Sequence, residues 1–145
     1  MIVVDTTVLV YAVGHDHPLR QPCRELVATV RDGRLRATTT PEVIQEFAHV
    51  RGRRRGRFDA AELANDFARL LAPLMVVDEQ DLKDGLSVFA GNDRLGAFDA
   101  VLAAAAVRRG ASALVSADRA FASVEGVPHV DPNQPGYLTT LTRRS

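Results

Sequence analysis

The sequence is short of several residue types, and each shortage excludes a class of protein. Cys23 is the only cysteine among 145 residues, so one chain can form neither a disulfide framework nor a multi-cysteine metal site. No apolar run is long enough to cross a bilayer, and the first residues show neither a basic segment nor a cleavage site. We therefore expect a cytoplasmic protein that does not enter a membrane.

An excess of either charge is lacking as well. Lysine and arginine together number 18, as do aspartate and glutamate, so the formal net charge is zero and does not require a nucleic-acid partner. Lys83 is the only lysine, and five of the seven residues from 51 to 57 are arginines. Such a run is either a solvated loop or a surface that contacts phosphates or a partner's carboxylates. The arginines are Arg51, Arg53, Arg54, Arg55 and Arg57.

The length of the chain suits one domain with a sizeable core. Short β-branched runs alternate with helical apolar spacing, which indicates an α/β protein. We expect a mostly parallel sheet of four to five strands, covered by helices on both faces. Residues 1–131 should form the domain and residues 132–145 a tail. The predicted strands are 2–4, 35–39, 74–77, 113–115 and 127–130.

The predicted helices follow from apolar spacing and from capping residues. They are 8–12, 19–31, one that begins at Pro41 and is broken near Gly52, 59–71, 79–90 and 98–109. Asp59 resembles the first residue of a capping box, because Glu62 follows three residues later. In the helix 79–90, the apolar residues Leu82, Leu86 and Phe89 are expected to face inward.

Four acidic residues occupy positions that are unusual for surface charges: Asp5, Glu46, Asp99 and Asp118. Asp5 and Asp118 follow predicted strands, Glu46 lies near the apolar face of its helix, and Asp99 lies at the start of another. Each has an ordinary alternative as a cap, a turn residue or an edge charge. In a parallel α/β sheet, however, strand ends and the starts of the following helices share one edge, so we expect the acids to converge there.

Several carboxylates in one cleft raise each other's pKa unless a cation compensates them. Oxygen ligands suit Mg²⁺ or Mn²⁺, and a cluster without histidine or cysteine argues against zinc. The four histidines have no spacing typical of a metal site. The predicted cofactor is therefore Mg²⁺ or Mn²⁺.

Four segments in order resemble one known family, the PIN-domain ribonucleases, and most of all the VapC-type toxins of bacterial toxin–antitoxin pairs. They are Ile2–Leu9 (IVVDTTVL), Thr40–Phe47 (TPEVIQEF), Phe98–Ala106 (FDAVLAAAA) and Leu114–Phe121 (LVSADRAF). Each motif is weak alone, but the ordered set covers nearly the whole chain. Thr7 departs from the pattern, since the family more often has serine or asparagine there.

The resemblance implies a three-layer PIN-like fold and a Mg²⁺- or Mn²⁺-dependent endoribonuclease. It makes Asp5, Glu46, Asp99 and Asp118 the catalytic acids. The metal ligands would be Asp5, Asp99 and Asp118, and Thr6 and Ser116 would support them. It also implies an RNA substrate, a small cognate antitoxin and a homodimer. The antitoxin is expected to insert near the active site. The helices 19–31 and 59–71 are candidate partner surfaces, with ordinary core helices as the alternative.

Three other functions fit parts of the sequence. A haloacid-dehalogenase phosphatase also begins with a strand-end aspartate, but it needs a second one where this chain has Thr7. A receiver domain needs paired acids near its start and a late lysine, whereas the only lysine is Lys83. A PIN-like module that binds RNA or a partner without cutting remains the main alternative.

Overall fold

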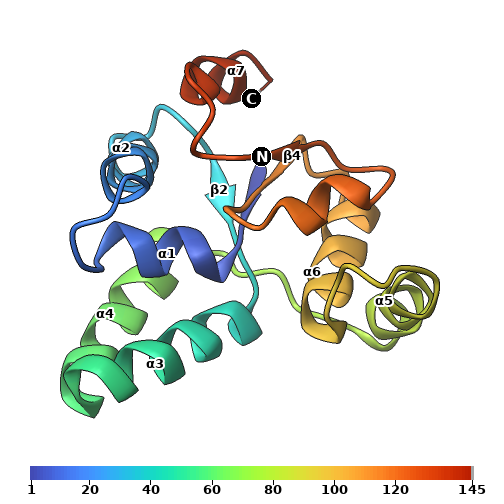
Figure 1. Ribbon diagram of the computed structural model, residues 1–145, viewed down its shortest axis with the longest axis horizontal. Helices are drawn as coiled ribbons and strands as arrows, with labels where there is room; N and C mark the ends of the chain where they lie inside the picture. The colour runs from blue at the N-terminus through green and yellow to red at the C-terminus, as the bar shows by residue number, and fades with distance from the viewer. Residues whose placement is uncertain (145) are drawn as a thin grey trace.

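The computed structural model describes residues 1–144 and is built around a four-stranded parallel sheet with the strand order β2-β1-β3-β4. The strands are short: β1 is Ile2–Val4, β2 Ala37–Thr38, β3 Ala113–Val115 and β4 His129–Val130. Figure 1 shows this sheet between two groups of helices, α1 to α4 on one side and α5 and α6 on the other. The predicted α/β class, with a mostly parallel sheet of four to five strands, is confirmed.

The pairing register brings the carboxyl ends of the strands to one edge. Val4 pairs with Val115, and Val115 pairs with Val130. Beyond the strands, the Asp5 amide donates to the Val115 carbonyl at 3.0 Å, and the Ser116 amide donates to the Val130 carbonyl at 3.2 Å. Asp5 and Ser116 therefore lie next to each other at this edge, although 111 positions separate them in the sequence.

The helices that cover the sheet bury one continuous core. They are α1 (Thr6–Ala12), α2 (Arg20–Arg31), α3 (Pro41–Arg55), α4 (Arg57–Leu70), α5 (Glu79–Gly91), α6 (Ala97–Arg108), the 3₁₀ helix η1 (Arg119–Ser123) and α7 (Tyr137–Arg144). In the described residues, no helix is both long and apolar enough to span a bilayer. The core includes Ile2, Val3 and Leu114 of the sheet and Ala103 of α6, which are fully buried.

The arginine run lies mostly inside a helix rather than in the expected loop. Helix α3 continues to Arg55 and ends at Gly56, whose φ of 98° is easily adopted only by glycine. Arginine is a good helix former, and one internal glycine was not enough to stop the helix. The capping box predicted at Asp59 is wrong, because α4 already begins at Arg57, after Gly56.

Two further predictions fail around α5. Residues 74–77 form no strand, although the Met75 amide donates to the Thr39 carbonyl at 2.9 Å. Leu82, Leu86 and Phe89 do not face inward, since each is 46% exposed. The inward face of α5 carries Asp81 and Gly85 instead, which are both buried.

Helix α5 turns this small and charged face towards α6. A Cβ atom at Gly85 would lie 2.5 Å from the Val101 Cα, so the two helix backbones approach closely there. The fully buried Asp81 carboxylate accepts hydrogen bonds from Arg108 at 2.6 Å and from Arg109 at 2.8 Å. Burial disfavours the Asp81 charge, but these hydrogen bonds hold the pKa of Asp81 below its usual range.

The carboxyl-terminal segment, expected to be a tail, contains a helix. In α7, Leu141 is fully buried and Tyr137 nearly so, and the Tyr137 hydroxyl donates to the Pro22 carbonyl at 2.5 Å. Proline and glycine before Tyr137 obscured this helix in the sequence, because they break apolar spacing.

Candidate active site

Asp5 follows strand β1 and caps helix α1. The residue is 3% exposed, and its Oδ2 atom accepts hydrogen bonds from the Ser116 hydroxyl at 2.7 Å, the Thr7 hydroxyl at 2.8 Å and the Thr7 amide at 3.3 Å. No described residue donates to the other carboxylate oxygen, Oδ1. Three donors on one oxygen fix the orientation of the carboxylate and leave its second oxygen for another ligand.

Thr7 connects the ends of β1 and β3, a role that the sequence analysis missed. Its hydroxyl donates to Asp5 and accepts a hydrogen bond from the Ala117 amide at 3.0 Å. The Ser116 hydroxyl in turn accepts from the Asp118 amide at 2.9 Å. A threonine directly after a strand-end aspartate can make such local turn contacts, which is the signal that was available.

Glu46 projects from α3 and contacts α1. The Thr6 hydroxyl donates to its Oε2 atom at 2.6 Å, so the helix that Asp5 caps also orients Glu46. Glu42 lies one turn earlier on α3, and its Oε2 atom is buried without a hydrogen-bond partner among the described residues. Glu42 was not among the site residues predicted from the sequence, although its spacing of four residues from Glu46 predicts that both lie on one helix face.

Asp99 lies in the first turn of α6, where it could have been an ordinary helix cap. The cap position is Gly96, and no side-chain hydrogen bond caps this helix. Burial, and then the charges of Asp5, Glu46 and Asp118, raise the pKa of Asp99 from 3.8 to about 6. The four predicted acids are therefore close enough to act on one another electrostatically.

Asp118 is exposed and has a structural role of its own. Its Oδ1 atom accepts a hydrogen bond from the Ala120 amide at 2.8 Å and caps η1. It contributes the smallest of the three charge effects on Asp99. Of the four acids, Asp118 lies furthest towards the margin of the group.

The other three predicted acids share one cavity of about 510 Å³. Its lining divides into a carboxylate part and an apolar part from α5 and α6. The lining residues are Asp5, Thr40, Glu42, Val43, Glu46, Val77, Asp78, Glu79, Leu82, Leu86, Ala97, Phe98, Asp99, Val101 and Leu102. None of them is basic. Among residues 1–144, no three acidic, histidine or cysteine side chains already converge as ligands around one point.

The arginine run lies outside this cavity. The Arg51 guanidinium donates to both Asp59 oxygens, at 2.5 Å and 3.3 Å, and to the Val13 carbonyl at 2.9 Å. These contacts join α3 to α4 and to the residue after α1, so Arg51 has a structural role. Arg53, Arg54, Arg55 and Arg57 are exposed.

A sequence profile of the PIN domain matches residues 2–127. The chain belongs to the PIN-domain family. A relative with 53% identity is ribonuclease VapC7 of Mycobacterium tuberculosis, where the match covers 99% of this PIN-domain chain and all of the relative. Ribonuclease VapC23 of the same species is 34% identical, over 85% of this chain and 97% of its own.

Solved structures of two VapBC complexes contain a chain with the same fold. A DNA-bound VapBC complex of Salmonella typhimurium superposes with a TM-score of 0.64 and 16% identity, over 90% of this chain and 97% of that one. VapBC2 of Rickettsia felis, bound to a promoter DNA fragment, superposes with a TM-score of 0.69 and 14% identity. This match covers 90% of this chain and 98% of the other. The profile thus confirms the family expected from the four motifs, and the solved structures confirm the expected fold.

Proposed function

We propose that this PIN-domain chain is a divalent-metal-dependent endoribonuclease and the toxin of a toxin–antitoxin pair that acts on RNA in the cytoplasm. The observation that carries the proposal is the cavity in which Asp5, Glu46 and Asp99 meet. The 53% identity to a VapC ribonuclease over the whole chain supports the same activity.

The chemistry of the site fits a hard cation. The cavity offers carboxylate oxygens and no basic side chain, and the Glu42 Oε2 atom is buried without a hydrogen-bond partner among the described residues. Burial, and then the charges of the neighbouring acids, raise the pKa of Asp99. Mg²⁺ is typically held by one or two carboxylates with several waters, which suits acids that do not all converge. Asp5 and Asp99 would hold the ion, with Glu46, Asp118 and Glu42 completing the site directly or through water.

A bound divalent ion would lower the pKa of water and polarise the scissile phosphate. The chain's own residues position the reaction. Ser116 and Thr7 fix one Asp5 oxygen by hydrogen bonds and leave the other available to a ligand, and Thr6 orients Glu46. We expect water to attack the phosphorus in line with the P–O bond that breaks. The attacking water gives up a proton, and the leaving oxygen takes one up.

Substitution of Asp5 tests the proposal. Asp5→Asn keeps the side chain's shape and removes its charge, so cleavage of a mixed RNA pool with Mg²⁺ or Mn²⁺ should fall by about 100-fold or more, since each ~1.4 kcal/mol of lost transition-state stabilisation is tenfold in rate. Asp99→Asn should act alike. Asp16→Asn, at an exposed position away from the cavity, is the matched control and should cleave normally.

The alternative, a PIN-like module that binds without cutting, makes the opposite prediction. It requires that wild-type protein free of contaminating nuclease leaves the RNA intact with either metal. Full cleavage by Asp5→Asn would remove the assigned role of the acids. Both variants should still unfold in a cooperative thermal transition, which shows that the loss of activity is not a loss of the fold.

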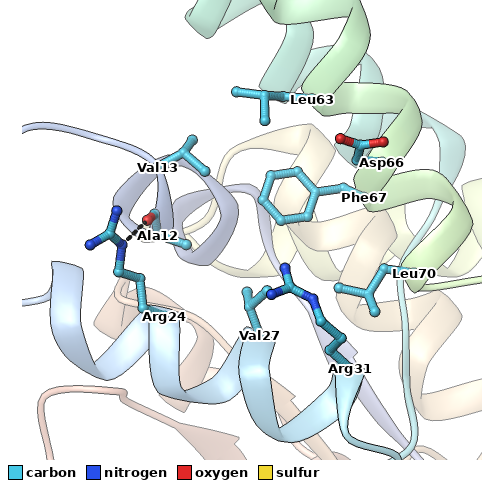
Figure 2. Close-up of a pocket in the computed structure, with 9 residues that line it drawn as sticks. All are labelled: Ala12, Val13, Arg24, Val27, Arg31, Leu63, Asp66, Phe67 and Leu70. Carbon is cyan, nitrogen blue, oxygen red and sulfur yellow. Dashed lines mark hydrogen bonds between the residues drawn. The ribbon is translucent and has the colours of Figure 1, made fainter.

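A second cleft suits the antitoxin. Figure 2 shows side chains from α2 and α4 facing each other across it, with Phe67 between them. The cleft has a volume of about 670 Å³ and is bordered by Arg24 and Arg31 of α2 and by Asp66 of α4. These two helices were candidate partner surfaces in the sequence, and we propose that an antitoxin segment with apolar and acidic side chains binds in this cleft.

Co-purification tests this partner site. Leu63→Asp places a charge in the apolar lining of the cleft, so the chain should no longer co-purify with the product of a short neighbouring reading frame. RNA cleavage should persist, because the cleft is separate from the acidic cavity. Phe58→Ala, an exposed position on the same helix, is the control. Retained co-purification of Leu63→Asp would exclude the cleft.

The remaining expectations are proposals of the same kind. The exposed arginines Arg53, Arg54, Arg55 and Arg57 would contact RNA phosphates or the antitoxin, and their replacement by serine should flatten the salt dependence of RNA binding. A homodimer is expected from the resemblance, and light scattering of the purified chain measures it.

A further inference from the structure

Phe98 is an exposed aromatic residue beside a catalytic acid. It is 76% exposed, it directly precedes Asp99, and it lines the same cavity as Asp5 and Glu46. An aromatic ring that folding leaves so open gains little from the core. Its position therefore suggests that it is used by something that enters the cavity.

The apolar part of the cavity continues from Phe98 across to α5. Leu82 and Leu86 line it, and both are about half exposed. They are available because Asp81 and Gly85, rather than the leucines, pack against α6. One cavity thus has an apolar wall of Phe98, Leu82 and Leu86 beside a carboxylate wall.

This lining limits how RNA can be held. The cavity contains no arginine, lysine or histidine to bind a phosphate, and its many carboxylates repel one. Apart from a metal ion, the attraction must come from another part of the nucleotide. A base has flat apolar faces, and stacking on aromatic side chains is the usual way in which unpaired RNA bases are bound.

We propose that Phe98 is the stacking platform for an unpaired base next to the scissile phosphate. The proposal rests on the proposed ribonuclease function and names the form of RNA that the site takes. Phe98 and Asp99 line the same cavity, so a base stacked on Phe98 would keep its own phosphate within this cavity, beside the acids. Every base has a stacking face, so the contact selects unpaired over paired RNA and discriminates little between bases.

A second copy of the chain fits the cavity less well than a nucleotide does. A protein surface packed on Phe98 would cover the neighbouring carboxylates, and buried charges without partners are costly. A stacked nucleotide covers less of the cavity, so the carboxylates stay open to the cation and the water that would compensate them. Self-association through Phe98 is therefore the competing outcome of the experiment.

The test compares Phe98→Ala, Phe98→Trp and Phe58→Ala on a single-stranded RNA oligonucleotide with a mapped cleavage site. Phe98→Ala should raise KM by about 5- to 100-fold, the range expected for one lost stacking contact, with kcat little changed. Phe98→Trp should restore KM. Phe58 is exposed to the same degree, 78%, but lies on α4 away from the cavity, so Phe58→Ala should behave as wild type.

An abasic nucleotide, moved one position at a time past the cleavage site, identifies the stacked base. At one position, the abasic nucleotide should raise the KM of the wild type as much as Phe98→Ala does. The same nucleotide should not raise the KM of Phe98→Ala any further, because both changes remove the same contact. An unchanged KM in Phe98→Ala, additive losses at every position, or an altered oligomeric state of that variant would each overturn the proposal.

The failure of the ribonuclease proposal is recognised separately. If the wild type cuts no RNA with Mg²⁺ or Mn²⁺, the proposed ribonuclease function is wrong. RNA binding is therefore also measured in the Asp5→Asn background with and without Phe98→Ala, which requires no cleavage. Weaker binding of the double variant supports the stacking platform, and equal affinities reject it.

Discussion

At the scale of single residues, the site depends on a hydroxyl that supports a carboxylate. Thr7 occupies the position where the sequence departed from the family pattern, yet its hydroxyl contacts both Asp5 and the Ala117 amide. Threonine and serine place a hydroxyl at the same point. The departure is therefore conservative for the hydrogen bonds that hold the ends of β1 and β3 together.

Thr7→Val should lower the free energy of unfolding by about 1–2 kcal/mol, because it leaves the Ala117 amide without its acceptor and removes one donor to Asp5. RNA cleavage should fall about 10- to 100-fold, as for other losses of support to a metal ligand. Thr7→Ser is the matched control and should keep both properties. Urea unfolding and initial rates measure them, and a fully active Thr7→Val would contradict the role.

Asp99 predicts a pH dependence in the metal-free protein. Its pKa is 3.8 in a free chain and about 6 in the fold, so the folded state binds the proton more tightly. Ionisation of Asp99 therefore destabilises the fold as the pH rises from about 4 to about 6, and the penalty remains above that range. With EDTA present, Asp99→Asn should have a higher Tm than the wild type at pH 7.5, and this difference should shrink at pH 4.5.

Thermal unfolding across this range measures the effect. Asp16→Asn, at an exposed position, should show no such trend. A Tm difference that does not change with pH would mean that the Asp99 charge is already compensated in the metal-free protein. Added Mg²⁺ or Mn²⁺ should stabilise the wild type more than Asp99→Asn, since a ligand stabilises the state that binds it.

At the scale of elements, the contact between α5 and α6 shapes the cavity. Gly85 lets the helices approach, and Asp81 joins them through Arg108 and Arg109. This contact uses the polar and small face of α5. The apolar stripe of Leu82, Leu86 and Phe89 is consequently left at the surface, where its first two residues line the cavity.

Gly85→Ala should destabilise the protein by about 1–3 kcal/mol or more, because the new Cβ would meet the Val101 backbone at 2.5 Å and 2.9 Å. Gly91→Ala is the control on the same helix. A Cβ atom there meets nothing within 4 Å, so this variant should be neutral or slightly stabilised. Chemical denaturation compares the two, and equal stabilities would show that α5 can shift away from α6 at little cost.

The elements also show which features the sequence could predict. Helices α1 to α6 were predicted in outline from apolar spacing and capping residues, whereas α7 was missed. The strands β1 and β3 were predicted from short apolar runs. The inward face of α5 was not, because amphipathic spacing identifies an apolar stripe but not whether another element covers it. Asp81 is hydrogen-bonded to Arg108 and Arg109, which follow it by 27 and 28 positions, and no local sequence pattern predicts such a contact. The predicted acids Asp5, Glu46 and Asp99 do lie together, since strand ends converge in a parallel sheet.

At the scale of the whole molecule, α7 completes the core rather than trailing from it. Leu141→Ala should cost about 2–5 kcal/mol of stability, as expected for a fully buried leucine. Thr139→Ala, at an exposed position on the same helix, should change it by less than about 0.5 kcal/mol. If thermal unfolding finds Leu141→Ala as stable as the control, α7 is dispensable.

The pairing of β1 with β3 has a consequence for how the protein is made. The carboxylate of residue 5 is oriented by a hydroxyl 111 positions later, and Asp99 and β3 also belong to the last third of the chain. During synthesis, Asp5 is made long before Ser116, so its hydrogen bond to Ser116 cannot form until most of the polypeptide has been translated. A ribosome that stops early releases a fragment without an assembled centre, so a harmful activity would arise only from chains translated nearly to the end.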